Sequence, residues 1–281
     1  MDVVVQAILI GLIQGLTEFI PISSSAHLEL APWIFGWDSS PLLSSLAFDV
    51  FLHLGTLVAL LAYFWRDWIR LIGAVVGSIG QRRIGNDPDR RLGWLLILAT
   101  IPAAIIGFVG EDFVNDVLHG GSDAVRLAIA GFLVVGAIAL WLADRLGSQQ
   151  RELDELTVPS ALAIGFSQAL ALLPGISRSG ATITTGLALG LTRESAARFS
   201  FLLATPITLG AGLYGSRHLL DEAHTGTEWL ALAAGLAAAT IAGLAAIGFL
   251  LAWLRSRSVT IFSAYRIALA ALVVVLVLGG R

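Results

Sequence analysis

Two short polar stretches, Gln14–His27 and Pro174–Thr182, hold most of the side chains in this sequence that could do chemistry. Glu18, His27 and Arg178 supply a carboxylate, an imidazole and a guanidinium. Both stretches lie within otherwise apolar sequence, where a polar group is costly and therefore points to function. Hydroxyl groups accompany the three ionisable residues, on Ser23, Ser24, Ser25, Ser177, Ser179 and Thr182.

The first stretch combines a carboxylate with a helix break. Gln14 and Glu18 lie four residues apart, so on a helix they project from one face. Glu18 is a candidate for binding a divalent cation or for acid–base chemistry, and the alternative is a glutamate exposed to interfacial water. Pro21 breaks the helix. The serines at 23–25 then cap the next helix, or bind an anion together with its free N–H groups.

His27 and Arg178 each have a chemical and a structural interpretation. His27 follows Ser24 by three residues, so imidazole and hydroxyl could act as base and nucleophile; a purely structural histidine is the alternative. Arg178 follows a Pro-Gly break, and its planar, permanently charged fork suits two-pronged binding of phosphate. A salt bridge to Glu18 is the other interpretation, and it is compatible with phosphate binding. Asp49 and His53, four residues apart, either line the outer mouth of the site or lie in the membrane interface.

The composition is that of an integral membrane protein. The 281 residues are 57% hydrophobic and 13% charged, with a mean hydropathy of +0.85, whereas soluble domains carry roughly 25% charge. There is no Cys, and every basic residue apart from the histidines is Arg. Thiolate chemistry, disulfides, Cys-ligated zinc and a catalytic lysine are therefore excluded.

The apolar segments predict an all-α polytopic membrane protein. Most of them approach the roughly 20 residues that span a bilayer. Two shorter stretches, Ser23–Ile34 and Ser177–Leu191, each follow a polar motif and are interpreted as return arms of re-entrant hairpins. We expect one re-entrant helix hairpin and three transmembrane helices in each half. The apolar segments are Val3–Ile20, Leu42–Trp65, Leu92–Gly110, Val125–Ala143, Val158–Leu173, Ala196–Gly215, Trp229–Leu254 and Ile261–Leu278.

The two halves are interpreted as an inverted-topology repeat. At an offset of 154 residues (168 − 14 = 154), Gln14 falls on Gln168 and Ser23 on Ser177. The halves also share the order of their segments, and an odd number of spans inverts the second copy. We expect a single membrane domain over 1–281, with repeat one at about 1–145 and repeat two at about 155–281. In such repeats the site lies at the midplane between broken helices.

Charges in the loops predict the orientation, because short cytoplasmic loops gather Arg. Arginines at six positions place residues 66–91 inside, and Arg255 and Arg257 place the loop after residue 254 inside as well. The connections 111–123 and 221–228 are acidic and belong outside. Both termini are then predicted to lie outside.

The paired motifs resemble those of a known family, the undecaprenyl-diphosphatases of the bacitracin-resistance type. The family's (E/Q)xxxE pattern, followed by Pro, serines and His, is matched over Gln14–His27, and its PGxSRSxxT pattern is intact at Pro174–Thr182. This chain has Gln14 where many members have Glu. The resemblance covers essentially the whole chain. It implies hydrolysis of undecaprenyl diphosphate to undecaprenyl phosphate and inorganic phosphate, which recycles the lipid carrier for cell-wall synthesis, with a divalent cation (Mg²⁺ or Ca²⁺) as cofactor.

The resemblance and the residue types together predict how such a site works. The second motif would bind the diphosphate, and the first would hold the cation. Attack on phosphorus would come from Ser24 or from a water molecule, with His27 moving the proton, and the sequence leaves both routes open. The predicted catalytic residues are Glu18, Ser24, His27 and Arg178, the substrate-binding residues are Ser23, Ser25, Ser177, Ser179 and Thr182, and the metal ligands are Glu18 and Gln14.

The alternative function is a transporter or flippase of a polyprenyl phosphate or another anionic substrate, because inverted repeats with paired hairpins are a transporter architecture. The expected partners are the polyprenyl diphosphate lipid and membrane lipid, with no nucleic acid, and a homodimer is allowed. The expected location is the bacterial inner membrane, in a multi-pass arrangement.

The predicted orientation can be tested in this Cys-free chain. Single cysteines introduced next to Arg82 and next to Asp116 should react with a membrane-impermeant thiol reagent from opposite sides of the membrane, because these loops carry opposite charge bias. Reaction of both cysteines from the same side would contradict the orientation.

Overall fold

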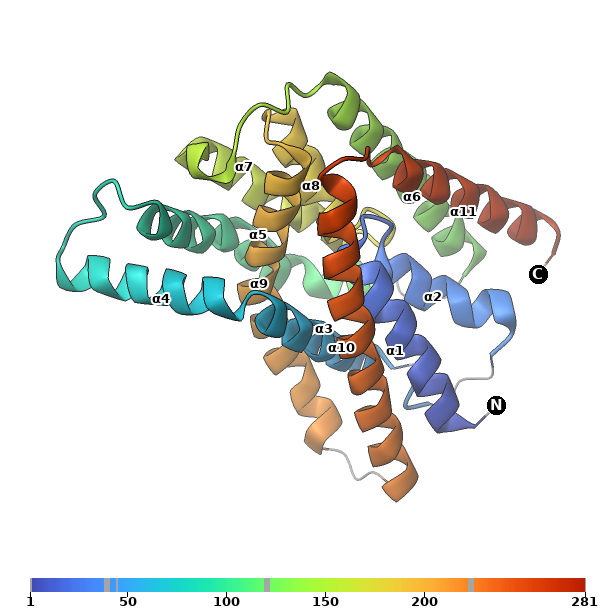
Figure 1. Cartoon of the computed structure of the whole chain (residues 1–281). Helices are drawn as coiled ribbons and strands as arrows, with labels where there is room; N and C mark the ends of the chain where they lie inside the picture. The colour runs from blue at the N-terminus through green and yellow to red at the C-terminus, as the bar shows by residue number, and fades with distance from the viewer. Residues whose placement is uncertain (1, 38–40, 44, 119–121, 222–224, 281) are drawn as a thin grey trace.

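The structure, a computed structural model, describes residues 2–37, 41–43, 45–118, 122–221 and 225–280. Within these ranges the ordered elements are helices, apart from a single bridge between Arg151 and Leu191. Figure 1 shows the arrangement, with α1 packed along α10 and α6 beside α11. The α-helices are α1 (Val3–Phe19), α2 (Ser24–Phe35), α3 (Leu46–Tyr63), α4 (Trp65–Gly80), α5 (Pro88–Leu118), α6 (Asp123–Leu146), α7 (Val158–Ala169), α8 (Arg178–Ala188), α9 (Arg193–Asp221), α10 (Gly226–Leu254) and α11 (Thr260–Leu278).

Several helices are long and apolar enough to cross a membrane. In the described part of the chain these are α5, α6, α9, α10 and α11, and a sixth span results if the bent pair α3 and α4 counts as one. This confirms an all-helical, multi-pass membrane protein. α5 continues beyond the predicted end at Gly110, so part of the connection 111–123 is helical. Residues 119–121 and 222–224, within the two acidic connections, lie outside the described residues.

Each polar motif lies where one short apolar helix ends and another begins. α1 ends at Phe19 and α2 begins at Ser24, after Pro21. α7 ends at Ala169, a 3₁₀ turn follows, and α8 begins at Arg178. α1 and α7 are shorter than the roughly 20 residues that a membrane-spanning helix needs. The predicted helix breaks at both motifs are therefore confirmed.

The segment after α3 differs from the prediction. The loop charges predict a loop over residues 66–91, whereas Trp65–Gly80 form α4, which turns by 79° from α3 at Phe64. α4 and α5 project together on the left of Figure 1. Arg66 and Arg70 made this segment resemble a charged loop. Its apolar residues nevertheless follow the spacing of an amphipathic helix. Its exposed large apolar side chains are Trp65, Ile69, Ile72, Val76 and Ile79.

Small residues bring α1 close to α10. A Cβ atom at Gly11 would overlap the carbonyl oxygen of Gly235, and one at Gly15 would overlap that of Ala239. α7 approaches α5 in the same way, through Gly165. Small residues allow such close backbone packing between membrane helices, where van der Waals contact drives association. The first arms of both motif regions are thus fixed against long apolar helices.

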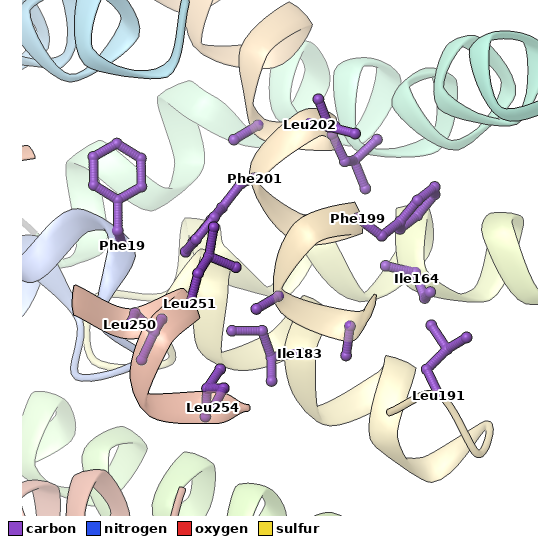
Figure 2. Close-up of a cluster of buried hydrophobic side chains, with 14 of the residues drawn as sticks. Phe19, Ile164, Ile183, Leu191, Phe199, Phe201, Leu202, Leu250, Leu251 and Leu254 are labelled. Atoms are coloured by element: carbon purple, nitrogen blue, oxygen red, sulfur yellow. The ribbon is translucent and has the colours of Figure 1, made fainter. Parts of the chain in front are cut away.

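The largest hydrophobic core lies next to both motifs. Figure 2 shows that it gathers Phe19 of α1, Ile164 of α7 and Ile183 of α8 with residues of α9 and α10, and all three of these side chains are buried. The rings of Phe19 and Phe201 meet edge to face, with centroids 5.5 Å apart. Phe19 follows Glu18 in the chain, and Ile183 follows Thr182. The core therefore fixes the immediate neighbours of the polar residues.

The α1–α10 packing predicts a specific loss of stability. Gly15→Val should lower the free energy of unfolding by about 1–3 kcal/mol, because the added atoms force the two backbones apart. Gly107→Val on α5 is the matched control, since no atom lies within 4 Å of a Cβ atom there. Thermal unfolding of the detergent-purified variants measures the difference. Equal unfolding temperatures for the two variants would contradict the close packing.

Candidate active site

The structure brings the two motifs together at Glu18. Arg178 Nη2 donates to Glu18 Oε1 at 2.8 Å, although 160 residues separate the two. On the other carboxylate oxygen, Ser24 Oγ donates to Oε2 at 2.5 Å and Gln14 Nε2 donates at 3.1 Å. Glu18 is only 6% exposed. A buried carboxylate needs this number of donors, because an unpaired buried charge is strongly destabilising.

Two serines hold the helix breaks in matching, uncommon backbone conformations. Ser23 has φ 75° and Ser177 has φ 72°, in the region that residues other than glycine seldom occupy. Each serine is the N-cap of the following helix, and its hydroxyl accepts a hydrogen bond from Ala26 N (3.4 Å) or Gly180 N (3.1 Å). Strain of this kind persists only where the surroundings fix it, and it clusters at functional sites. The first residues of the two capped helices are Ser24 and Arg178.

Most of the other predicted hydroxyls are engaged within the protein. Ser23 Oγ also accepts from Gly175 N at 3.1 Å, which joins the two motifs directly. The hydroxyls of Ser23 and Ser25 lie 3.2 Å apart, and so do those of Ser177 and Ser179. The capping interpretation, made for the serines at 23–25, thus describes Ser23, and Ser177 caps α8 in the same way. Thr182 Oγ1 donates to Arg178 O at 2.8 Å and lies 2.6 Å from Ser200 Oγ.

His27 lies near the site with its ring nitrogens turned to other partners. Nδ1 donates to Ser23 O at 2.7 Å, and Nε2 lies 2.7 Å from the Tyr265 hydroxyl, on which the ring also stacks. In the described part of the chain, no hydrogen bond joins His27 to Ser24 or Glu18. The predicted pairing of His27 with Ser24 is therefore absent from this arrangement, whereas a role for His27 in proton movement stays a prediction.

His53 lies closer to the carboxylate than His27 does. Its Nε2 is 3.5 Å from Glu18 Oε2, and its Nδ1 donates to Asp49 O at 2.7 Å. Because a carbonyl can only accept, Nδ1 carries a proton and Nε2 faces the carboxylate. From the sequence, Asp49 and His53 could line the site or lie in the membrane interface, and for His53 the geometry favours the site.

One buried residue near the motifs is missing from the predicted set. Arg266 lies within α11, is 0% exposed, and donates to Gly175 O at 2.7 Å. The signal was present in the sequence, because Arg266 is a lone charge inside the apolar segment Ile261–Leu278. Its partners are backbone carbonyls, which carry no side-chain pattern.

Two buried polar atoms at the centre of the site lack partners among the described residues, namely Gln14 Oε1 and Arg178 Nη1. Among the described residues, no group of three or more His, Cys, Asp or Glu side chains could hold a metal ion. Gln14 Oε1 and the Glu18 carboxylate are nevertheless oxygen donors of the kind that hard cations prefer. Mg²⁺ in particular is commonly held by one or two carboxylates together with water and substrate phosphates. The residues thus fit a cation bound jointly with a phosphorylated substrate.

Comparison with known proteins identifies the family. A family model described as bacitracin resistance protein BacA matches residues 7–272. An undecaprenyl-diphosphatase of Thermomicrobium roseum is 45% identical over 98% of this chain and 99% of its own length. Proteins of the same name from Moorella thermoacetica and Alcanivorax borkumensis are 47% and 46% identical, covering 96% and 94% of this chain and 97% and 95% of their own lengths. This chain belongs to the bacitracin resistance protein BacA family.

Proposed function

We propose that this protein hydrolyses undecaprenyl diphosphate to undecaprenyl phosphate and inorganic phosphate, the activity named for its relatives. The observation that carries the proposal is the buried cluster in which Glu18 binds both Ser24 and Arg178. It joins the hydroxyl of Ser24, the carboxylate of Glu18 as a proton acceptor, and the guanidinium of Arg178 as a phosphate-binding group. The product is the lipid monophosphate that carries cell-wall precursors.

The proposed architecture is an inverted repeat with two re-entrant hairpins, α1–α2 and α7–α8. The matching conformations of Ser23 and Ser177, at the offset of 154 residues, support it. So does the packing, because α1 of the first half approaches α10 of the second, and α7 of the second half approaches α5 of the first. The hairpins would meet near the middle of a bilayer, within a single membrane domain.

We place this domain in the bacterial inner membrane with both termini outside. The Arg-rich connection between α4 and α5 supports this orientation. Figure 1 shows that connection at the far left and both chain ends on the right. The polyprenyl tail of the substrate would lie in lipid against the helices while its diphosphate group enters between the hairpins.

Arg178 is the proposed anchor for the diphosphate. Its Nη2 binds Glu18, and its Nη1 is buried without a partner in the described part of the chain. A buried guanidinium N–H without an acceptor is costly, and a phosphate oxygen would satisfy it with a charge-assisted hydrogen bond. Arg178 also begins α8, so the N-terminal end of that helix adds partial positive charge to the same anion.

Ser24 is the proposed nucleophile, with Glu18 as its proton acceptor. The Ser24 oxygen would attack the terminal phosphorus, the bond from that phosphorus to the bridging oxygen would break, and undecaprenyl phosphate would leave. Glu18 would take the hydroxyl proton, since its Oε2 already accepts it at 2.5 Å. Water would then attack phosphorus and displace the serine oxygen. Glu18 would return the proton to that serine oxygen, and inorganic phosphate would be released. Arg178 would stabilise the phosphoryl charge in both steps.

Glu18 and Gln14 are the residues that would hold a divalent cation. A bound cation neutralises charge on phosphoryl oxygens during transfer. Gln14 would contribute Oε1, which is buried without a partner among the described residues. The first motif would thus contact the substrate phosphates through the cation. The second motif would contact them directly through the guanidinium of Arg178.

Phosphate release from undecaprenyl diphosphate by detergent-purified protein tests the proposed function. Detergent removes the two compartments that transport requires, so a transporter would release no phosphate. Steady release of one phosphate per lipid is the expected result. Binding of the lipid without any release would overturn the assignment as a phosphatase.

The three neighbouring serines test the proposed nucleophile. Ser24→Ala should abolish turnover while binding of the lipid diphosphate persists, because the covalent route loses its acceptor and Arg178 remains. Ser25→Ala is the matched control, since its hydroxyl lies 3.2 Å from that of Ser23 and does not contact Glu18 among the described residues. Ser23→Ala measures the separate effect of losing the cap of α2 and the contact with Gly175. All variants are measured at saturating cation. If Ser24→Ala is as active as Ser25→Ala, water attacks phosphorus directly.

Gln14 tests the proposed cation site. Gln14→Glu should lower the cation concentration needed for half-maximal activity, because it adds a carboxylate to an oxygen-ligand site. Gln14→Met should raise that concentration, because it removes the oxygen while keeping a side chain of similar length. Titration of activity with Mg²⁺ and with Ca²⁺ measures both shifts. An unchanged midpoint in both variants would place the cation elsewhere.

A further inference from the structure

Arg266 is a fully buried charge whose partners are all backbone carbonyls. It lies in α11, and among the described residues it forms no ion pair with a carboxylate. Isolated charges within membrane helices are rare and costly. Five hydrogen bonds to carbonyl oxygens compensate for the loss of solvent here.

The five carbonyls belong to three separate parts of the chain. Nη2 donates to Gly175 O at 2.7 Å and to Ile176 O at 3.0 Å, within the break before α8. Nη1 donates to Pro21 O at 3.5 Å, within the break before α2. The remaining two acceptors lie on α6, Leu133 O at 3.2 Å from Nε and Phe132 O at 3.4 Å from Nη2. One guanidinium therefore joins both helix breaks to a membrane-spanning helix.

The chemistry of arginine suits this position. Carbonyls at a helix break lack partners within the helix, and in hydrocarbon an unsatisfied carbonyl costs several kcal/mol. The guanidinium presents five N–H donors in a rigid plane, so it can serve carbonyls in several directions at once. A lysine in its place would keep the charge but offer three donors from a single nitrogen.

We propose that Arg266 is a positioning residue that sets the distance between the two hairpins. By holding Pro21 and Gly175–Ile176 together, it would fix Ser24 at the start of α2 relative to Arg178 at the start of α8. Its effect on hydrolysis rests on the proposed function. Its effect on the two helix breaks does not.

A glycine on α6 offers a way to displace the guanidinium without removing it. A Cβ atom at Gly136 would overlap Nη2 of Arg266, whereas no atom lies within 4 Å of a Cβ atom at Gly131 on the same helix. Gly136→Ala should therefore move the guanidinium away from its carbonyls. Gly131→Ala makes the same chemical change earlier on the same helix and serves as the matched control.

Hydrogen exchange and kinetics on the full-length protein in detergent test the proposal together. Gly136→Ala and Arg266→Lys should both speed exchange in peptides covering residues 19–27 and 173–182, while peptides from α10 stay unchanged. Both variants should lower kcat/KM by about 10²-fold, because a displacement of about 1 Å can cost this much. A fall in kcat together with a rise in KM is expected, since Ser24 and Arg178 would separate. Activity is expressed per folded protein.

Two results would overturn the proposal. One is exchange and kcat/KM in Gly136→Ala and Arg266→Lys that match those of Gly131→Ala. The other is a loss of activity that follows only the folded fraction, with KM unchanged, which would make Arg266 a stabilising residue alone. If the parent protein shows no phosphate release, the exchange measurement still decides whether Arg266 holds the two breaks, so failure of the proposed function is distinguishable.

Discussion

A helix can be broken inside hydrocarbon only if the freed backbone groups find partners, and both candidate hairpins depend on this constraint. On the N–H side, the hydroxyls of Ser23 and Ser177 cap α2 and α8, and Ser23 also binds the N–H of Gly175. On the carbonyl side, Arg266 serves both breaks. These groups permit two chain reversals next to each other, and that proximity allows one site to draw residues from both halves.

The charges at the site follow from the same constraint. Glu18 and Arg178 satisfy each other across the two hairpins, so each would leave an uncompensated buried charge if the other were absent. A phosphorylated ligand can compete for Arg178 because it brings its own negative charge, and a cation can compensate Glu18 at the same time. In the proposed mechanism the pair is therefore a resting arrangement that the substrate replaces.

Residue types predicted the helix breaks at the motifs, but not every contact of their side chains. Pro21 and the Pro-Gly pair in the second motif have local effects on the backbone, so the helix breaks could be predicted from sequence. The Glu18–Arg178 pair was one of two stated interpretations. α4 was missed because Arg66 and Arg70 near its start fit the charge pattern of a loop, and the carbonyl partners of Arg266 leave no trace in the sequence. The orientation of the His27 ring could not be predicted either, because its Nε2 contacts the hydroxyl of Tyr265, which is 238 residues away in the chain.

The two halves of the proposed repeat differ at the residues to which we assign the chemistry. At the offset of 154 residues, Ser24 corresponds to Arg178 and Glu18 corresponds to Leu172. Both Ser24 and Arg178 begin a capped helix, so the backbone directs two unlike side chains toward one point. A carboxylate at position 172 as well as 18 would place two negative charges together, and an arginine at position 24 as well as 178 would remove the proposed nucleophile. In the proposed mechanism the unequal pair combines a nucleophile and its base with an anion-binding group, so each proposed hairpin would depend on the other.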